Sequence, residues 1–227
     1  MQTVVITGAS GGIGFELVNC FLHSGWRVVA ISRNTSELEK IMHDRLIVLK
    51  ADINEIAEIE RIEKTCSAFS DIQIVINNAG TLINKPFFDI TENELINTYK
   101  ANVFAPFHLL QKLIPLLNKT ERAHVVNIGS MGGFQGSVKF AGLTAYSSSK
   151  FALAGLTELL AEEFKTENIS FNCLAIGAAQ TKMLEQAFPG YQAPVSGKEM
   201  AEFIFNFASK QAKLINGKII PVSVSTP

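Results

Sequence analysis

Two residues of the chain could carry acid–base chemistry together, Tyr146 and Lys150. They lie four residues apart in a stretch whose pattern predicts a helix over Ala145–Lys165, so both side chains project from one face of that helix. A cation beside a phenol favours the phenolate and lowers a tyrosine pKa that is ordinarily about 10. The pair therefore predicts a tyrosine that donates or accepts a proton near neutral pH.

A glycine-rich turn near the N-terminus predicts a cofactor that carries phosphate. An apolar run ending at Ile6 leads into Gly8-Ala9-Ser10-Gly11-Gly12-Ile13-Gly14, and a helical pattern follows from Phe15. Glycines let the backbone approach a pyrophosphate closely, and the first turn of the helix offers unpaired N–H donors. The residues of this turn that we expect to bind the cofactor are Gly8, Ser10, Gly12, Ile13 and Gly14.

Strand-like and helix-like segments alternate along the chain. The β-branched runs are Thr3–Thr7, Arg27–Ile31, Leu46–Lys50, Ile72–Ile76, His124–Ile128, Ser170–Ala175 and Lys218–Val222. The amphipathic stretches between them are Phe15–His23, Glu37–His43, Ile56–Phe69, Glu92–Leu117, Ala145–Lys165 and Glu199–Ser209. This alternation predicts a single doubly wound α/β domain of the Rossmann type over residues 1–227, with about seven parallel strands and helices on both faces.

Two segments, 130–144 and 177–197, break the alternation. Each follows a predicted strand at its C-terminal end, which is the edge where ligands bind in open α/β sheets. We therefore predict that these segments are substrate loops. Their large side chains indicate a mostly apolar substrate pocket, lined by Phe134, Phe140, Met183, Leu184, Phe188 and Tyr191.

Composition excludes several other classes of protein. The net charge is −1 and the basic residues are scattered, so we expect no nucleic acid or anionic membrane as partner. No apolar run approaches the roughly 20 residues of a membrane span. The four histidines show no metal-ligand spacing, so we expect no metal. Three scattered cysteines in apolar segments are typical of reduced thiols, which predicts a cytoplasmic protein.

These motifs occur in the order found in the short-chain dehydrogenase/reductase family, which the chain resembles over essentially its whole length. The matching residues are Thr7-Gly-x-x-x-Gly-x-Gly14, Asn77-Asn78-Ala79-Gly80, Asn102, Ser130 and Tyr146-x-x-x-Lys150. The resemblance implies hydride transfer between a nicotinamide and a carbonyl carbon, with Tyr146 as the general acid. It also implies that Lys150 lowers the pKa of Tyr146 and binds the nicotinamide ribose. Ser130 would donate to the carbonyl oxygen, and Asn102 would hold a water that links Lys150 to solvent.

The same resemblance extends the cofactor site, and two assignments in it have alternatives. The further cofactor contacts implied are Asp52, Ile53, Asn78, Ala79, Gly80, Gly177 and Thr181. For Asp52, a role as an N-terminal helix cap is an equal alternative. The segment between Ser130 and Tyr146 is about three residues longer than the resemblance leads us to expect, which leaves Ser137 as a rival to Ser130.

The end of the second predicted strand, Ser32-Arg33, indicates which nicotinamide cofactor is used. A carboxylate at this point would bind the ribose 2′-hydroxyl of NAD, whereas an arginine suits the 2′-phosphate of NADP. We therefore predict that the cofactor is NADP(H).

Together with the hydride transfer that the resemblance implies, this predicts an NADP(H)-dependent carbonyl reductase or alcohol dehydrogenase acting on a small ketone, aldehyde or secondary alcohol. The family resemblance also implies a homodimer or homotetramer packed through Glu92–Leu117 and Ala145–Lys165. A non-catalytic NADP-binding sensor is the main alternative, followed by an epimerase or dehydratase.

Overall fold

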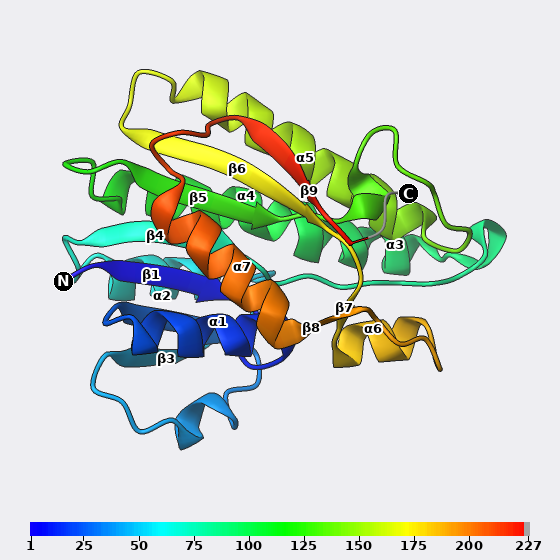
Figure 1. Ribbon diagram of the computed structural model, residues 1–227, viewed down its shortest axis with the longest axis horizontal. Coiled ribbons are helices and arrows are strands. Elements are labelled where there is room, and N and C mark those ends of the chain that lie inside the picture. Colours follow the sequence, from blue (N-terminus) through cyan, green and yellow to red (C-terminus); the bar gives the residue numbers. More distant parts are fainter. Residues whose placement is uncertain (225–227) are drawn as a thin grey trace.

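A seven-stranded parallel sheet forms the centre of the computed structural model, which describes residues 1–224 (Figure 1). The strand order is β3-β2-β1-β4-β5-β6-β9, so the doubly wound α/β domain predicted from the sequence is confirmed. The last three residues of the predicted domain, 225–227, lie outside the described part. The strands are β1 (Thr3–Thr7), β2 (Arg27–Ser32), β3 (Leu46–Lys50), β4 (Ile72–Asn77), β5 (Ala123–Ile128), β6 (Ile169–Ile176) and β9 (Lys218–Val222).

Helices cover both faces of the sheet. Helices α1 (Gly12–His23) and α7 (Gly197–Lys210) lie over one face, in front of the sheet in Figure 1. Helices α2 (Ile56–Cys66), α4 (Ala105–Leu113) and α5 (Thr144–Glu163) cover the other. Because both faces are covered, the inner strands read as continuous apolar runs. In β1, Val4 and Ile6 pack under α1 and α7, whereas Val5 packs on the opposite side.

The long helix expected over Glu92–Leu117 is interrupted. It consists of α3 (Glu92–Tyr99), a π-helical turn η3 (Lys100–Phe104), α4, and a 3-10 turn η4 (Ile114–Leu116). Pro106 has no backbone N–H, so regular α-helical hydrogen bonding cannot continue through this point. The wider turn contains Asn102 and buries its side chain. Such π turns within helices often occur at functional sites.

The prediction of a helix over Glu37–His43 is wrong. Only a single 3-10 turn, η1 (Leu38–Lys40), forms between β2 and β3. Leu38 is fully buried, but Met42 is 93% exposed, so the apolar residues of this segment do not share one packed face. The segment therefore lacks the packed apolar face that stabilises most helices in proteins.

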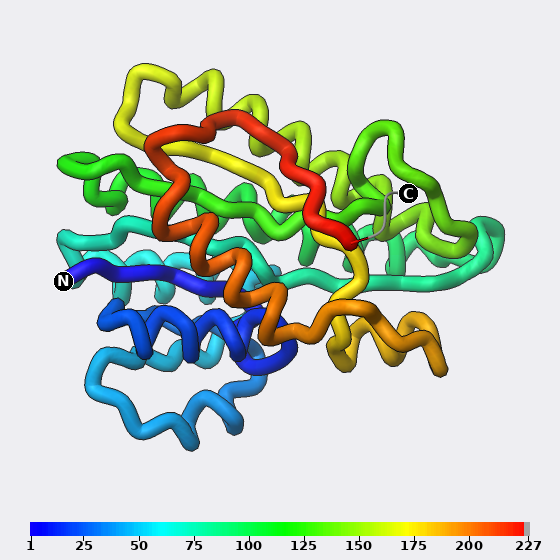
Figure 2. The backbone as a smooth tube through the Cα atoms, in the orientation of Figure 1, coloured from blue at the N-terminus to red at the C-terminus, as the bar shows by residue number. Residues whose placement is uncertain are grey.

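The connections after β4, β5 and β6 gather at one end of the sheet, at the right in Figures 1 and 2. The connection after β4 contains η2 (Phe87–Asp89), and the one after β5 contains the 3-10 turn η5 (Met131–Gly133). Segment 177–197, expected as a loop, contains a short helix α6 (Lys182–Ala187). It also contains two short paired strands, β7 (Ala179–Gln180) and β8 (Val195–Ser196). Thr181 starts α6, because its hydroxyl accepts a hydrogen bond from the N–H of Leu184.

Two further properties hold within residues 1–224. None of the helices in this range is both long and apolar enough to cross a membrane. No group of three or more His, Cys, Asp or Glu side chains there is arranged to hold a metal ion.

A buried histidine on β5 makes folding stability depend on pH. The Nδ1–H of His124 donates to the Ala208 carbonyl at 2.9 Å, and Nε2 accepts from Asn172 at 2.9 Å. Burial lowers the pKa of His124 from 6.5 to about 4. The folded protein therefore holds this ring neutral, and the unfolded chain binds a proton more readily. The stability from this residue is complete above pH 6.5 and is lost as pH falls toward 4.

We expect the wild type to lose about 2 kcal/mol more unfolding free energy between pH 7.5 and pH 5 than a His124→Gln variant, which cannot titrate. Urea unfolding at the two pH values measures both changes. The comparison uses the difference between the two pH values for each protein, so any general cost of the substitution cancels. Equal pH dependence in the two proteins would show that His124 does not titrate on unfolding.

Candidate active site

The glycine-rich turn has a backbone shape that only glycine adopts easily at two positions. Gly8 has φ +66° and Gly12 has φ +53°, both in the left-handed region. A Cβ on Gly8 would lie 2.8 Å from the Cα of Ala79, and one on Gly14 would lie 2.1 Å from the Gly8 carbonyl oxygen. Around Gly11, in contrast, nothing lies within 4 Å of the same position. The turn is therefore tightly packed on its protein side and open on its cavity side.

The segment after β4 is fastened to this turn by hydrogen bonds. The hydroxyl of Thr7 accepts from the N–H groups of Asn78 and Ala79 at 3.1 and 3.0 Å. The side-chain amide of Asn78 donates to the carbonyls of Thr7 and Gly8 at 3.0 and 3.2 Å. These bonds fix the two segments that would hold the pyrophosphate and the adjoining ribose.

The turn provides an anion site at the start of α1. Gly11 precedes the helix with no side-chain cap, and the first helical turn contains no acidic residue. Its N–H groups therefore face the cavity without a competing carboxylate, and the helix dipole favours negative charge there. A bound pyrophosphate fits this arrangement. Of the turn residues predicted to bind the cofactor, Gly8, Ser10, Gly12 and Ile13 line the cavity together with Gly11, whereas Gly14 does not and serves the close packing of α1.

The end of β2 lies in the same cavity. Ser32 and Arg33 both line it, and the Ser32 hydroxyl is 2.7 Å from the hydroxyl of Ser10. Arg33 is exposed, and within residues 1–224 its guanidinium forms no ion pair. Asp52 also lines the cavity, and its carboxylate accepts a hydrogen bond from the N–H of Asn54. It closes a local turn and does not cap α2, whose first residue is preceded by Glu55.

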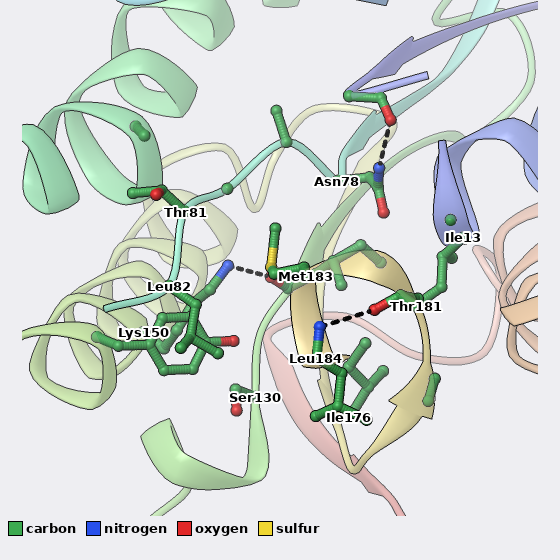
Figure 3. Close-up of a pocket in the computed structure, with 18 of the residues that line it drawn as sticks. Ile13, Asn78, Thr81, Leu82, Ser130, Lys150, Ile176, Thr181, Met183 and Leu184 are labelled. Carbon is green, nitrogen blue, oxygen red and sulfur yellow. Dashed lines mark hydrogen bonds between the residues drawn. The ribbon is translucent and has the colours of Figure 1, made fainter. Parts of the chain in front are cut away.

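Three of the four predicted catalytic residues meet at the other end of this cavity. Ser130 follows β5, and Tyr146 and Lys150 come from the first turns of α5. Figure 3 shows Ser130 and Lys150 on one side of the cavity, with Thr181 and Leu184 opposite. The Lys150 ammonium donates to the Ile128 carbonyl at 2.9 Å and lies 5.9 Å from the centre of the Tyr146 ring.

Asn102, the fourth predicted catalytic residue, is fully buried and does not line the cavity. Its side chain exchanges hydrogen bonds with the backbone N–H and carbonyl of Thr81 and donates to Ser149 at 2.9 Å. Gly80 lies between Asn102 and Lys150. A Cβ there would be 3.0 Å from the Asn102 amide oxygen and 3.4 Å from the Lys150 ammonium. The glycine thus keeps these two side chains close to each other.

Burial shifts the pKa values of both acid–base groups. Desolvation raises the pKa of Tyr146 above its usual value, and a hydrogen bond from Ser130 opposes this rise. Desolvation also lowers the pKa of Lys150 to about 8, although the nearby Cys173 thiol opposes that shift. The direction for Tyr146 is opposite to the one expected from the sequence. The reason is geometric, since the Lys150 ammonium is bonded to the Ile128 carbonyl and loss of water is the largest cause of the shift in the pKa of Tyr146.

The two candidate serines differ in position. Ser130 lines the cavity, and its hydroxyl lowers the pKa of Tyr146. The hydroxyl of Ser137 instead donates to the backbone carbonyls of Met131 and Phe134, and Ser137 does not line the cavity. The geometry therefore favours Ser130 as the group that polarises a substrate.

The remaining wall of the cavity is mostly apolar. The cavity measures about 1090 Å³, and five of the six predicted pocket residues line it: Phe140, Met183, Leu184, Phe188 and Tyr191. Phe134 does not, because the chain reverses at Gly136 (φ +81°) and brings Val138 and Phe140 to the wall instead. The sequence analysis missed Met131, Val138 and Leu143, although all three are apolar residues of the segment it had singled out.

The other predicted cofactor contacts also line this cavity. They come from the C-terminal ends of four strands and comprise Ile53, Asn78, Ala79, Gly80, Gly177 and Thr181. Gly177 has no room for a side chain, since a Cβ there would lie 2.6 Å from the Ser223 hydroxyl. One continuous cavity thus joins the glycine-rich turn, Arg33 and Tyr146.

Known proteins resemble this chain over most of its length. The family model for short chain dehydrogenases matches residues 2–192. A chloroplastic tropinone reductase homologue from Arabidopsis thaliana is 31% identical over 213 residues, which is 90% of this chain and 63% of that protein. An uncharacterised oxidoreductase from Staphylococcus saprophyticus is 30% identical over 210 residues, covering 89% of this chain and 81% of the relative.

Solved structures show the same fold. A 3-ketoacyl-(acyl-carrier-protein) reductase from Brucella melitensis, solved with NADH, superposes with a TM-score of 0.87 at 25% identity. The match covers 98% of this chain and 96% of that one. The protein ElxO, solved with NADP, has a TM-score of 0.86 at 22% identity, with 98% and 97% coverage. The chain therefore belongs to the short chain dehydrogenase family and is an oxidoreductase of the NAD(P)-dependent kind.

Proposed function

We propose that the protein is an NADPH-dependent carbonyl reductase that converts an apolar ketone or aldehyde to an alcohol. The observation that carries this proposal is the single cavity in which Ser130, Tyr146 and Lys150 lie together with the phosphate-binding turn. The Tyr146 phenol is protonated at neutral pH, which suits a group that donates a proton to a reduced carbonyl.

Each of the catalytic residues has a separate role in such a reduction. A bound nicotinamide supplies the hydride that reaches the carbonyl carbon. The Tyr146 hydroxyl donates its proton to the carbonyl oxygen as negative charge develops there. Ser130 donates a hydrogen bond to the same oxygen and stabilises that charge. Lys150 holds the ribose of the cofactor and places a positive charge close to Tyr146.

Asn102 does not line the cavity and affects the catalytic residues through its hydrogen bonds. Its hydrogen bonds to Thr81 and Ser149 fix the chain after β4 against α5, which carries Tyr146 and Lys150. The absence of a side chain at Gly80 also leaves the Asn102 amide oxygen and the Lys150 ammonium close to each other, where a bridging water would join the two groups. We infer that Asn102 positions Lys150 and supports return of the proton to Tyr146.

Arg33 and the paired hydroxyls of Ser10 and Ser32 support NADPH as the preferred cofactor. A 2′-phosphate placed at the end of β2 would meet a guanidinium and hydroxyl donors, without a carboxylate from β2 to repel it. The planar guanidinium can bind two phosphate oxygens at once. The 2′-hydroxyl of NADH would lose the ionic part of this interaction.

We expect Arg33→Ala to weaken NADPH binding by about 10- to 100-fold, since hydrogen bonds to a charged group contribute most of the selectivity. The Kd for NADH should change by less than about 3-fold, because its ribose carries no phosphate at this point. Fluorescence titration of both cofactors measures the two values. Arg61→Ala, an exposed arginine on α2 outside the cavity lining, is the matched control. Tighter binding of NADH than NADPH by the wild type would refute the assignment.

The outer faces of three helices support assembly into a homodimer or homotetramer. Large apolar side chains on α3, η3, α4 and α5 are between 39% and 70% exposed, namely Leu95, Ile96, Phe104, Phe107, Phe151 and Leu159. Exposed apolar side chains in this number, on neighbouring helices, are typical of surfaces that bind another protein. We infer that a second copy of this chain covers them, as the sequence analysis predicted.

A further inference from the structure

One side chain, Asn84, touches both predicted substrate loops. It lies in the segment after β4, which runs outward between the other two loops at the right of Figure 2. Its amide nitrogen donates to the Ala187 carbonyl at 2.8 Å, across 103 residues of sequence. Ala187 is the last residue of α6, so this bond satisfies a carbonyl that the short helix leaves without an internal partner.

The other side of Asn84 meets the loop after β5. Gly142 has φ +85°, and a Cβ built on it would lie only 2.1 Å from the Asn84 side-chain oxygen. The next residue, Lys85, donates its backbone N–H to the Gly142 carbonyl at 2.9 Å. This close approach therefore requires glycine at position 142, both for the backbone angle and for the space.

The segment that carries Asn84 is anchored at its far end. The Lys85 ammonium pairs with Glu94 at 2.8 Å. Glu94 also completes the capping box that begins α3 at Thr91. Asn84 therefore projects from a fixed support, although its own side chain is exposed.

Both loops that Asn84 contacts supply walls of the reaction cavity. Val138, Phe140 and Leu143 come from one loop, and Met183, Leu184 and Phe188 come from the other. Asn84 itself lines a smaller pocket of about 330 Å³ with Arg33, Met183 and Gln186, next to the main cavity. A side chain that fixes both loops thus sets the distance between the two apolar walls.

We propose that Asn84 is a positioning residue that joins the two substrate loops over the reaction cavity. It acts through these loops and not on the reacting atoms. The inference rests on the proposed function only for its kinetic readout, since loop closure can also be measured without turnover. Nothing about Asn84 in the sequence indicated this role, because both contacts cross long stretches of chain.

Kinetics and proteolysis test the proposal together. Asn84→Ala should raise KM for the carbonyl substrate by about 5-fold, the effect of one net hydrogen bond, with kcat nearly unchanged. The Kd for NADPH, which binds mainly at the glycine-rich turn, should stay within about 2-fold of the wild type. Limited trypsin digestion should cut faster at Lys139 and Lys182, one exposed lysine in each loop. Asn93→Ala, an exposed asparagine on α3, should leave every value unchanged.

Two further variants distinguish positioning from a general loss of folding. Asn84→Asp keeps the shape but cannot donate to the Ala187 carbonyl, so it should behave like Asn84→Ala. Gly142→Ala should raise KM as well, and the double variant should be less impaired than the product of the two single effects. Full activity and normal protection from trypsin in Asn84→Asp would overturn the proposal. If the wild type reduces no carbonyl, faster cleavage of both loops in Asn84→Ala would still support it, and unchanged cleavage would refute it.

Discussion

Replacing Tyr146 with phenylalanine should lower kcat for carbonyl reduction by about 10²- to 10⁴-fold, the usual contribution of a positioned general acid. The substitution removes one oxygen and keeps the ring that lines the cavity. NADPH affinity should therefore stay close to that of the wild type, because the contacts proposed for its phosphates, at the glycine-rich turn and Arg33, lie at the other end of the cavity. Stopped-flow single-turnover measurements at saturating cofactor report the loss at the chemical step directly.

The matched control is Tyr99→Phe, which makes the same chemical change at the end of α3, outside the cavity lining. It should keep full activity. A Tyr146→Phe variant that turns over at the wild-type rate would show that Tyr146 is not the general acid. In that case Ser130 would be the next proton donor to test, since it lies in the same cavity.

Lys150→Met should reduce kcat by about 10²- to 10³-fold, the loss typical of removing one preorganised electrostatic group. The same change should leave the melting temperature unchanged or raise it. Lys150 is 5% exposed, and burial already lowers its pKa to about 8. Keeping this side chain charged therefore raises the free energy of the folded state. An unbranched apolar side chain of similar length removes that cost. Loss of activity without loss of stability is the pattern expected of a residue retained for function.

Lys165→Met provides the comparison, because this exposed lysine lies two residues beyond the end of the same helix. It should alter neither kcat nor the melting temperature appreciably. Calorimetry and steady-state kinetics on the same preparations give both quantities. If Lys150→Met lowers the melting temperature by as much as a buried packing residue would, its loss of activity would reflect folding and not chemistry.

The fold could be predicted from the sequence because local pattern and tertiary environment agree in the strands. Runs such as Val4-Val5-Ile6 are apolar at every position, as a strand covered on both faces requires, and all three residues are fully buried. The glycine-rich turn was equally informative, since its residue types follow from backbone angles and close contacts that glycine alone permits.

Features set by long-range contacts could not be predicted in this way. The π turn around Asn102 contacts α5, and the apolar pattern of Glu92–Leu117, which continues through Pro106, does not show where the helix is interrupted. Phe134 and Phe140 look alike in sequence, yet the turn at Gly136 sends only Phe140 to the cavity. The pKa of Tyr146 was expected in the wrong direction because desolvation cannot be read from residue spacing.

The most direct test of the account is a label-transfer measurement. The wild-type protein would be incubated with NADPH deuterated at the transferred position and a panel of apolar ketones and aldehydes. We expect consumption of NADPH that matches the alcohol formed, with deuterium on the new carbinol carbon. Tight NADPH binding with no transfer to any carbonyl would contradict the reductase assignment, and a cofactor-binding sensor would then be the better description.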